Sequence, residues 1–329
     1  MKRMILAAGA AALLSGAAAA QTVTLKLNSG APPRSYLHSK VFEPWSKAVE
    51  ADSGGTLKIQ RFYGGTLGNF LVTYDRVLDG VADIGFTLAA LTGGKFKQQG
   101  VAGLPFETKN ANEAAVALWN LYEKGVTRAE FNQVQLLGIW AFPNAAIHSK
   151  TPIATLADVS GKKLSISSAI GAKIVVGLSA TPVTLPPNQA YQAISRGITD
   201  GTLMPFTGMQ TFKIYEVAKN HLDVALGADT ALLFMNKKKY DSLPAKAKAA
   251  IDKHSYLPLS KKLADETQKE WERGRNTVGK SVKTLPEAEE AKWQKALAQV
   301  SEEWIKSTPD GAKILEAFRA EVKAVRGGK

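Results

Sequence analysis

Short apolar segments alternate with helical segments in the middle of the chain, and this alternation constrains the fold more than any other feature. From Leu156 to Pro205 the sequence is LADVSGKKLSISSAIGAKIVVGLSATPVTLPPNQAYQAISRGITDGTLMP. Apolar spacing, β-branched residues and turn residues predict the order of the elements. They are a strand around Leu164 and Ile166, a helix at Ala169–Leu178, a strand at Thr181–Leu185, and a helix at Gln189–Arg196 capped by Asn188.

The first part of the chain shows the same alternation. The predicted elements are a strand at Val23–Leu27, a helix at Tyr36–Ala51, a strand at Leu57–Phe62, a helix at Phe70–Leu78 and a strand at Ile84–Thr87. Strands that alternate with helices form mainly parallel sheets, which bind ligands at the ends of their strands. We therefore predict an α/β protein, and 329 residues are enough for about two lobes.

The chain is basic, with a formal net charge of +13, so nucleic-acid binding has to be considered. The lysines are scattered along predicted helices, often beside Glu or Asp. The densest cluster, Lys237–Lys239, has no interleaved aromatic residues on which bases could stack. We therefore interpret the charge as a solvated helical surface and expect no nucleic-acid partner.

The N-terminal segment, residues 1–20, has the pattern of a secretory signal peptide. Lys2 and Arg3 precede an apolar run, and small residues end the segment before Gln21. No later window of about 20 residues is free of charge, so we expect no membrane span. The sequence predicts cleavage before Gln21 and a mature protein in the periplasm.

Catalytic and metal-binding patterns are weak or missing in this sequence. It contains no cysteine, which excludes thiol catalysis, thiolate metal ligands and a lipid-attachment residue. The histidines have none of the close spacings of metal sites, and there is no Gly-x-Ser-x-Gly elbow. The run at 160–163 matches Ser-x-x-Lys without its partner motifs, and the glycines at 64–68 fit no phosphate-binding pattern. We expect no metal, no cofactor and no catalytic residues.

Several short motifs occur in the order found in one protein family. They are Ser53-Gly-Gly-x-Leu-Lys-Ile59, Tyr63-Gly-Gly-x-Leu-Gly68, Gly80-x-Ala-Asp83, Leu104-Pro-Phe106, Asp158-x-x-Gly161, Tyr191-x-Ala-Ile194, Gly197-Ile-x-Asp-Gly201, and Asn236-Lys237 followed by Tyr240 and Leu243-Pro244. From residue 23 to about 305 the chain resembles the periplasmic solute-binding proteins of TRAP transporters, the DctP-like family. No single motif is specific, but their common order is strong evidence.

This resemblance implies a two-lobed periplasmic binding protein fold of a type II-like kind, with mainly parallel sheets flanked by helices. Lobe I would contain residues 21–144 plus about 235–275, and lobe II about 145–234 plus about 280–329. Residues 257–325 show the periodicity of long amphipathic helices, and the tryptophans of these helices are expected in the core. The resemblance implies that one long helix is a spine that links both lobes.

The chain departs from the family pattern at two places that bear on the ligand. The strand after Gly161 usually ends in an arginine that grips a carboxylate, and Ser165 occupies that position. Leu203 and Met204 stand where the family has Glu and Asn. Strand ends and the loops after them are expected to face the cleft. The predicted ligand-binding residues are Arg34, Tyr36, Phe70, Leu88, Trp140, Asn144, Ser165, Ser167, Met204, Phe206 and Phe234.

The missing arginine leaves two alternatives for the ligand. Either the ligand is uncharged or largely apolar, aromatic in part, and packs on Phe70, Trp140, Met204 and Phe234, or another cation replaces the arginine. Arg34 is the candidate cation, although a solvated loop arginine is at least as good an interpretation of it. In either case we do not expect a typical dicarboxylate ligand, because a serine hydroxyl cannot offset the lost hydration of a buried carboxylate.

The resemblance implies a monomeric solute-binding protein that is not an enzyme. It would capture a small organic ligand between its lobes and deliver it to the small and large membrane subunits of a TRAP permease. An exported α/β hydrolase is the alternative from another class, weakened by the lack of a recognisable nucleophile, base and orienting acid. A ligand-sensing binding protein without a permease is a further alternative.

Overall fold

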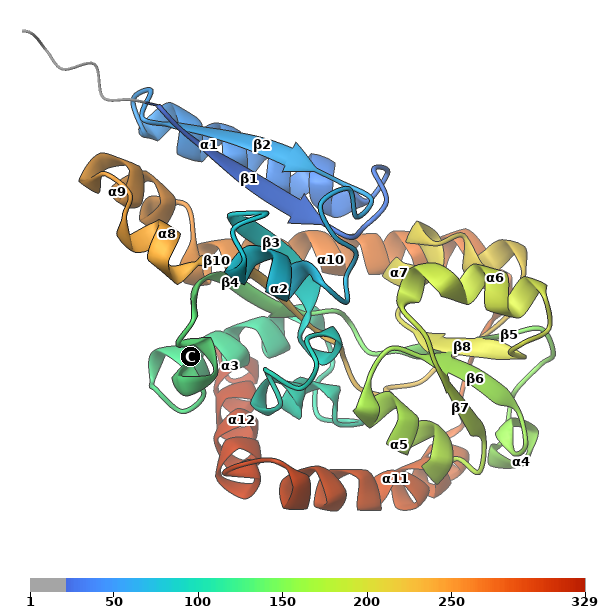
Figure 1. The fold of residues 1–329 in the computed structure, drawn as a ribbon. Coiled ribbons are helices and arrows are strands. Elements are labelled where there is room, and N and C mark those ends of the chain that lie inside the picture. The colour runs from blue at the N-terminus through green and yellow to red at the C-terminus, as the bar shows by residue number, and fades with distance from the viewer. Residues whose placement is uncertain (1–21, 329) are drawn as a thin grey trace, which may run out of the picture.

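Two β-sheets form the centres of two lobes in the computed structural model of the protein, which describes residues 22–328 (Figure 1). The predicted signal peptide and its cleavage site before Gln21 lie outside these residues. Helices flank both sheets, and the chain passes between the lobes more than once (Figure 1). The predicted α/β two-lobe fold is thereby confirmed.

The sheet of lobe I has the strand order β2-β1-β3-β10-β4. Its strands are β1 Val23–Ser29, β2 Leu57–Phe62, β3 Ile84–Leu88, β4 Val134–Ala141 and β10 Thr230–Asn236. Strand β1 pairs in parallel with β2 and β3, whereas β10 runs antiparallel to β3 and β4. Leu25 and Leu27 alternate along β1 and are fully buried, as the two-residue period of a strand requires.

Helices and short 3-10 or π turns (η) cover this sheet. They are η1 His38–Phe42, α1 Glu43–Asp52, α2 Thr73–Leu78, η2 Ala89–Leu91, η3 Gln98–Gly103, α3 Ala111–Glu123, η4 Arg128–Phe131, α8 Lys237–Asp241 and α9 Ala245–Lys253. Helix α3 begins where Asn110 accepts a hydrogen bond from the backbone N–H of Glu113, which satisfies a free amide of the first turn.

The sheet of lobe II has the order β11-β9-β5-β8-β6-β7. Its strands are β5 Ala146–Ser149, β6 Lys163–Ile166, β7 Thr181–Thr184, β8 Gly201–Met204, β9 Asn220–Asp223 and β11 Val282–Thr284. Strand β5 is antiparallel to β8 and β9, and the other pairs are parallel. Both sheets are therefore mixed, each containing one strand that runs against its neighbours.

The helices of lobe II lie around this second sheet. They are α4 Leu156–Val159, α5 Ala169–Gly177, η5 Pro187–Gln189, α6 Ala190–Ser195, α7 Phe206–Thr211, η6 Ile214–Glu216, η7 Gly279–Ser281 and α11 Glu287–Ser307. The predicted cap at Asn188 is wrong, because a 3-10 turn that starts at Pro187 precedes α6 and makes Gln189 its N-cap residue.

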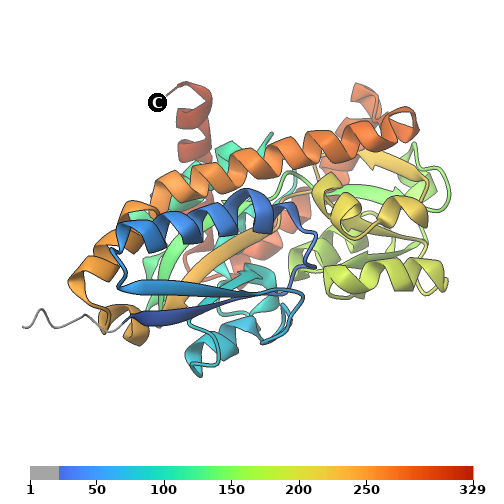
Figure 2. The same ribbon diagram turned by 90° about the horizontal axis from the view of Figure 1, so that it is seen from above.

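Up to Val278, three connections join the lobes. Residues 142–145 link β4 to β5, residues 224–229 link β9 back to β10, and the long helix α10, Tyr256–Val278, runs across both lobes. Its 23 residues correspond to about 34 Å, and it packs on β4 in lobe I and on α7 in lobe II (Figure 2). The predicted spine helix is present. No helix among the described residues is both long and apolar enough to cross a bilayer.

The C-terminal helices return the chain to lobe I. Trp293 and Trp304 on α11 are buried in the core, as predicted. Helix α12, Gly311–Arg326, packs on α3, and Arg326 pairs with Glu113 at 2.8 Å. The predicted lobe boundaries remain a proposal, which we adjust at two places. We propose that α12 and all of β10 belong to lobe I, since β10 pairs along its whole length in the first sheet.

Candidate ligand-binding site

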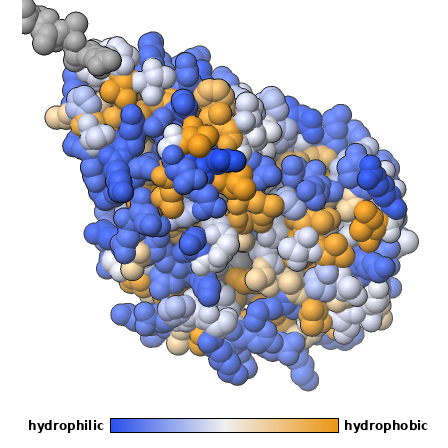
Figure 3. Space-filling model, viewed as in Figure 1, coloured by the Kyte–Doolittle hydropathy of each residue, from blue (hydrophilic) through white to orange (hydrophobic). Residues whose placement is uncertain are grey.

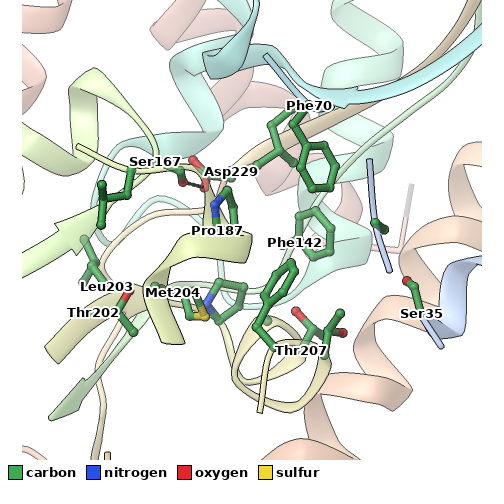
Figure 4. Close-up of a pocket in the computed structure, with 18 of the residues that line it drawn as sticks. Ser35, Phe70, Phe142, Ser167, Pro187, Thr202, Leu203, Met204, Thr207 and Asp229 are labelled. Atoms are coloured by element: carbon green, nitrogen blue, oxygen red, sulfur yellow. Dashed lines mark hydrogen bonds between the residues drawn. The ribbon is translucent and has the colours of Figure 1, made fainter. Parts of the chain in front are cut away.

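A pocket lies where the two lobes face each other (Figure 4). Lobe I lines it with Ala31, Ser35, Tyr36, Leu37, Phe70, Phe86 and Leu88. The connections between the lobes contribute Phe142 and Asp229. Lobe II lines it with Ser165, Ile166, Ser167, Leu185, Pro187, Ala190, Thr202, Leu203, Met204, Pro205, Thr207, Gly208, Thr211 and Phe212. Orange, apolar side chains gather on both sides of the hollow between the lobes (Figure 3).

The wall from lobe I is built of aromatic rings held in fixed positions. Phe70 and Phe86 meet edge to face, with ring centroids 5.8 Å apart and planes at 83°. The hydroxyl of Thr87 donates to the carbonyl oxygen of Phe70 at 2.7 Å. A Cβ atom at Gly30 would lie 2.8 Å from the Phe70 ring, so only glycine permits this approach. This wall presents a rigid apolar surface.

The wall from lobe II mixes apolar side chains with hydroxyl groups. The hydroxyl of Thr202 donates to the carbonyl oxygen of Ser165 at 3.1 Å, and that of Ser165 donates to the carbonyl oxygen of Gly201 at 3.4 Å. These two hydroxyls therefore bond within the sheet. The hydroxyl of Thr207 is buried and has no hydrogen-bond partner among the described residues.

A pair of buried histidines supports the lobe II wall from behind. Nε2 of His148 lies 3.0 Å from the carbonyl oxygen of Met204, and its Nδ1 lies 2.8 Å from Nδ1 of His221. A carbonyl can only accept, so His148 donates through Nε2 and accepts from His221 through Nδ1. Burial lowers the pKa of His148 to about 3, with a further contribution from His221, and lowers that of His221 to about 4. Both rings are neutral at pH 7.

Asp229 is the acidic residue of the pocket, and the sequence analysis missed it. Its Oδ2 accepts a hydrogen bond of 2.7 Å from the hydroxyl of Ser167 (Figure 4). Burial raises the pKa of Asp229, while hydrogen bonds from Ser167 and Ser168 oppose this effect. Among the described residues that line the pocket there is no Lys, Arg or His. The sequence feature that could have indicated this residue is its position as an acid directly before the apolar strand β10.

Several predicted site residues do line the pocket: Tyr36, Phe70, Leu88, Ser165, Ser167 and Met204. The hydroxyl of Tyr36 donates to that of Thr267 on α10 at 2.9 Å, so this residue offers its ring to the pocket. Ser165 is almost fully buried. Their role in ligand binding remains a prediction, which their common position supports.

Two polar residues among the predictions lie outside the pocket lining. Arg34 is exposed, and its Nε donates to the carbonyl oxygen of Thr211 at 3.1 Å beside a separate hollow. Asn144 uses Nδ2 to donate to the carbonyl oxygen of Thr108 at 2.7 Å. Both side chains thus bond to backbone carbonyl groups and do not line the pocket, contrary to the expectation that they face it, although Thr211, the partner of Arg34, is itself a lining residue.

Three predicted aromatic residues also lie outside the lining, in the core. Trp140 is fully buried behind Phe86, with stacked rings 5.5 Å apart. Phe234 faces α2 and contacts Tyr74, and Phe206 packs against the His148 ring at 5.0 Å. For Phe234 and Phe206 the cause is strand and helix geometry, because neighbouring residues of one element point to different faces, whereas Trp140 shares a core cluster with Phe86 and is buried behind its ring. Phe86 and Phe142, whose rings lie beside that of Trp140, line the pocket in its place.

Comparison with known proteins supports the two-lobe description. Residues 27–307 match the family described as bacterial extracellular solute-binding protein, family 7. A marine metagenome TRAP solute-binding protein, described as specific for aromatic acids and crystallised with 3-hydroxybenzoate, is 28% identical. The match has a TM-score of 0.88 and covers 92% of this chain and 99% of that chain.

Two further relatives come from named bacteria. A TRAP solute-binding protein of Rhodoferax ferrireducens in complex with copurified benzoate is 28% identical, with a TM-score of 0.87 over 92% of this chain and 98% of that one. A protein of Comamonas testosteroni named outer membrane transporter protein TsaT is 25% identical over 99% of both chains. The resemblance seen in the sequence is therefore confirmed, and this chain belongs to the family 7 bacterial extracellular solute-binding proteins.

Proposed function

We propose that this protein captures a small, largely apolar organic molecule with an aromatic ring and delivers it to the membrane subunits of a TRAP transporter. The observation that carries the proposal is the composition of the pocket. Its walls are formed by Phe70, Phe86, Phe142 and Met204, without Lys, Arg or His among the described lining residues. An aromatic ring buries a large apolar area in such a pocket and gains from edge-to-face contacts.

The same pocket is poorly suited to a dicarboxylate. A carboxylate that leaves water loses several kcal/mol of hydration, which a bidentate arginine would offset. At the position where the family resemblance places that arginine, the Ser165 hydroxyl bonds to a backbone carbonyl. Arg34, the alternative cation, is exposed and does not line the pocket, and its Nε bonds to the carbonyl oxygen of Thr211 at the pocket's edge. The geometry thus favours the apolar alternative over a replacement cation.

The relatives support this ligand class without identifying the ligand. The marine metagenome protein is described as specific for aromatic acids, and the Rhodoferax ferrireducens protein was obtained with benzoate. From the ligands of these relatives we transfer to this protein only the aromatic ring, and we do not transfer the acidic group. The family is one of binding proteins rather than enzymes, and on this basis we favour transport over the hydrolase alternative.

Capture would couple to delivery through the two lobes. A ligand that touches both walls of the pocket favours the closed arrangement by its additional affinity for that state. The permease subunits would then recognise the closed protein. The predicted signal peptide at residues 1–20 would place this event in the periplasm.

Two measurements test the proposed function. Mass spectrometry of small molecules released by denaturing the purified protein is expected to find an aromatic compound. Calorimetry is then expected to give micromolar binding of that compound or of p-cresol, and no measurable binding of succinate or malate. At 100 times its dissociation constant the ligand would stabilise the fold by about 2.7 kcal/mol. Micromolar binding of succinate would contradict the proposal.

A further inference from the structure

A carboxylate without a cationic partner lies on the wall of the pocket, where residues 224–229 lead into strand β10. Figure 4 shows the hydrogen bond of 2.7 Å that Oδ2 of Asp229 accepts from the Ser167 hydroxyl, and the Ser168 hydroxyl also lowers the pKa of this carboxyl group. Protein atoms surround Asp229, but part of its surface stays accessible within the pocket. No ion pair to this carboxylate occurs among residues 22–328. A polar acceptor in an apolar pocket destabilises the protein unless a donor satisfies it.

The backbone around Asp229 is fixed before any ligand arrives. The N–H of Phe142 donates to the carbonyl oxygen of Asp229 at 3.1 Å, and the N–H of Ala228 donates to that of Ala102 at 3.0 Å. Gly227 has a φ of +81°, and a Cβ atom there would lie 2.0 Å from the carbonyl oxygen of Gly103. Only glycine fits this approach, so the connection is held in one position.

The partner of Asp229 is fixed in the same way. Ser167 follows strand β6, and the next residue, Ser168, caps helix α5 by accepting from the N–H of Gly171 at 3.0 Å. The two groups therefore form a preorganised pair, with Asp229 from the connection between the lobes and Ser167 from lobe II. Preorganised polar groups of this kind fix the orientation of a ligand at little entropic cost.

The chemistry of the pair determines which ligand group it accepts. The hydroxyl of Ser167 donates to Oδ2 of Asp229, and the carboxyl group keeps further lone pairs that can accept a hydrogen bond from a ligand. We propose that Asp229, positioned by Ser167, accepts a hydrogen bond from a hydroxyl or amino group of the ligand. This inference rests on the proposed aromatic ligand and defines its polar substituent: a phenol-like or amine-like donor binds at Asp229, because Ser167 leaves acceptor sites of this carboxyl group open.

The experiment compares two probes that differ in one donor. p-Cresol carries a hydroxyl, and 4-methylanisole keeps the oxygen but has a methyl group in place of the proton. For the unaltered protein, calorimetry or thermal shift is expected to show p-cresol binding at least about tenfold more tightly, since a buried acceptor that is left without a donor destabilises the complex. In D229N the amide can donate to the ether, so the preference is expected to fall to within about threefold.

Two further variants complete the test. Asp241 is an exposed carboxylate on α8 that pairs with Lys237 at 2.8 Å, and D241N is expected to keep the tenfold preference. S167A removes the group that positions Asp229, and it is expected to reduce the preference by less than D229N does. The size difference between the two probes is the same for all variants, so it cancels in this comparison.

The outcomes separate this inference from the proposed function. If aromatic probes bind but p-cresol and 4-methylanisole bind equally, or if D229N keeps the full preference, the donor site is wrong and the aromatic pocket stands. If benzoate binds more tightly than p-cresol and D229N abolishes this, Asp229 pairs with a carboxylate as a protonated acid, and the inference is overturned. If no aromatic probe binds, the proposed function falls together with the inference.

Discussion

The two walls of the pocket differ in chemistry, and the difference indicates which property of the ligand each wall recognises. Lobe I presents ring and alkyl carbons, and its Tyr36 hydroxyl is bonded to Thr267. Lobe II presents hydroxyl groups and the Met204 thioether, and Ser167 on this side holds Asp229. Lobe I therefore determines the shape and apolar area of the site, whereas lobe II and the connection at Asp229 determine which polar group is accepted.

The two walls also differ in what supports them. The lobe I wall rests on stacked aromatic rings, with Trp140 behind Phe86 at a centroid distance of 5.5 Å. The lobe II wall rests on the His148–His221 pair, which bonds to the carbonyl oxygen of Met204. The packing of aromatic rings does not depend on pH. Buried neutral histidines do depend on it, because protonation at low pH places a charge in the core. Acidification is therefore expected to weaken lobe II before lobe I.

The largest expected effect tests the role of the lobe I wall. F70A removes the ring that meets Phe86 edge to face in the pocket. We expect the affinity for the aromatic ligand to fall about hundredfold, corresponding to about 3 kcal/mol, because large-to-small changes lose both contact area and packing. Calorimetry with the ligand measures this loss.

F131A is the matched control for this variant. Phe131 is a buried aromatic residue of lobe I that packs on Phe96 outside the pocket lining. Its replacement is expected to lower the melting temperature and to leave the dissociation constant within about threefold, since no contact with the pocket is lost. An F70A protein that binds as tightly as the unaltered one would show that lobe I does not supply the apolar contacts.

Sequence periodicity predicted the elements of this fold well because the spacing of apolar residues reflects the residue period of a helix or a strand. Strand β2 coincides with the predicted Leu57–Phe62, and α5 differs from its prediction by one residue. The faces of the central strands were harder to predict. Strand β10 is apolar on both sides, so its pattern cannot indicate that Phe234 points to α2 and away from the pocket.

The polar part of the site could not be predicted for a different reason. The Ser167–Asp229 pair joins residues 62 positions apart, and it depends on the path of the connection between the lobes. The antiparallel direction of β10 likewise follows from where the chain re-enters lobe I. Local patterns contain neither kind of information, whereas the family resemblance supplied the lobes and the position of Ser165.

The residues that support the two walls are expected to respond differently to pH. The pKa values of His148 and His221 in the fold, about 3 and 4, lie below the value of about 6.5 in an unfolded chain. The stability from their neutral forms is complete above pH 6.5 and is lost as the pH falls from 6.5 toward 3. Buried His148 alone would account for a loss of about 2–3 kcal/mol at pH 4.5. Urea unfolding at pH 7.5 and 4.5 measures it.

Three variants locate the source of this pH dependence. Burial also lowers the pKa of His38 in lobe I, which lies 2.9 Å from the Ser29 hydroxyl. H148N is expected to remove more of the stability difference between pH 7.5 and 4.5 than H38N does. H254Q, at a partly exposed residue that pairs with Asp52, is the control. An equal pH response in H148N and the unaltered protein would refute the role of the lobe II pair.

The smallest expected effect compares a residue inside the pocket with one beside it. Met204 lines the lobe II wall and is nearly buried, whereas Arg34 is exposed and bonds to the carbonyl oxygen of Thr211. M204A removes thioether and methylene contacts with the ligand, so we expect its affinity to fall about tenfold, or about 1.4 kcal/mol. R34A is expected to change the affinity by less than about threefold, because an exposed hydrogen bond contributes little. Calorimetry of both variants at several salt concentrations measures the difference. If R34A weakened binding more than M204A, and the loss shrank at high salt, a cation would be holding an acidic ligand, and the lobe I side of the site would supply charge as well as shape.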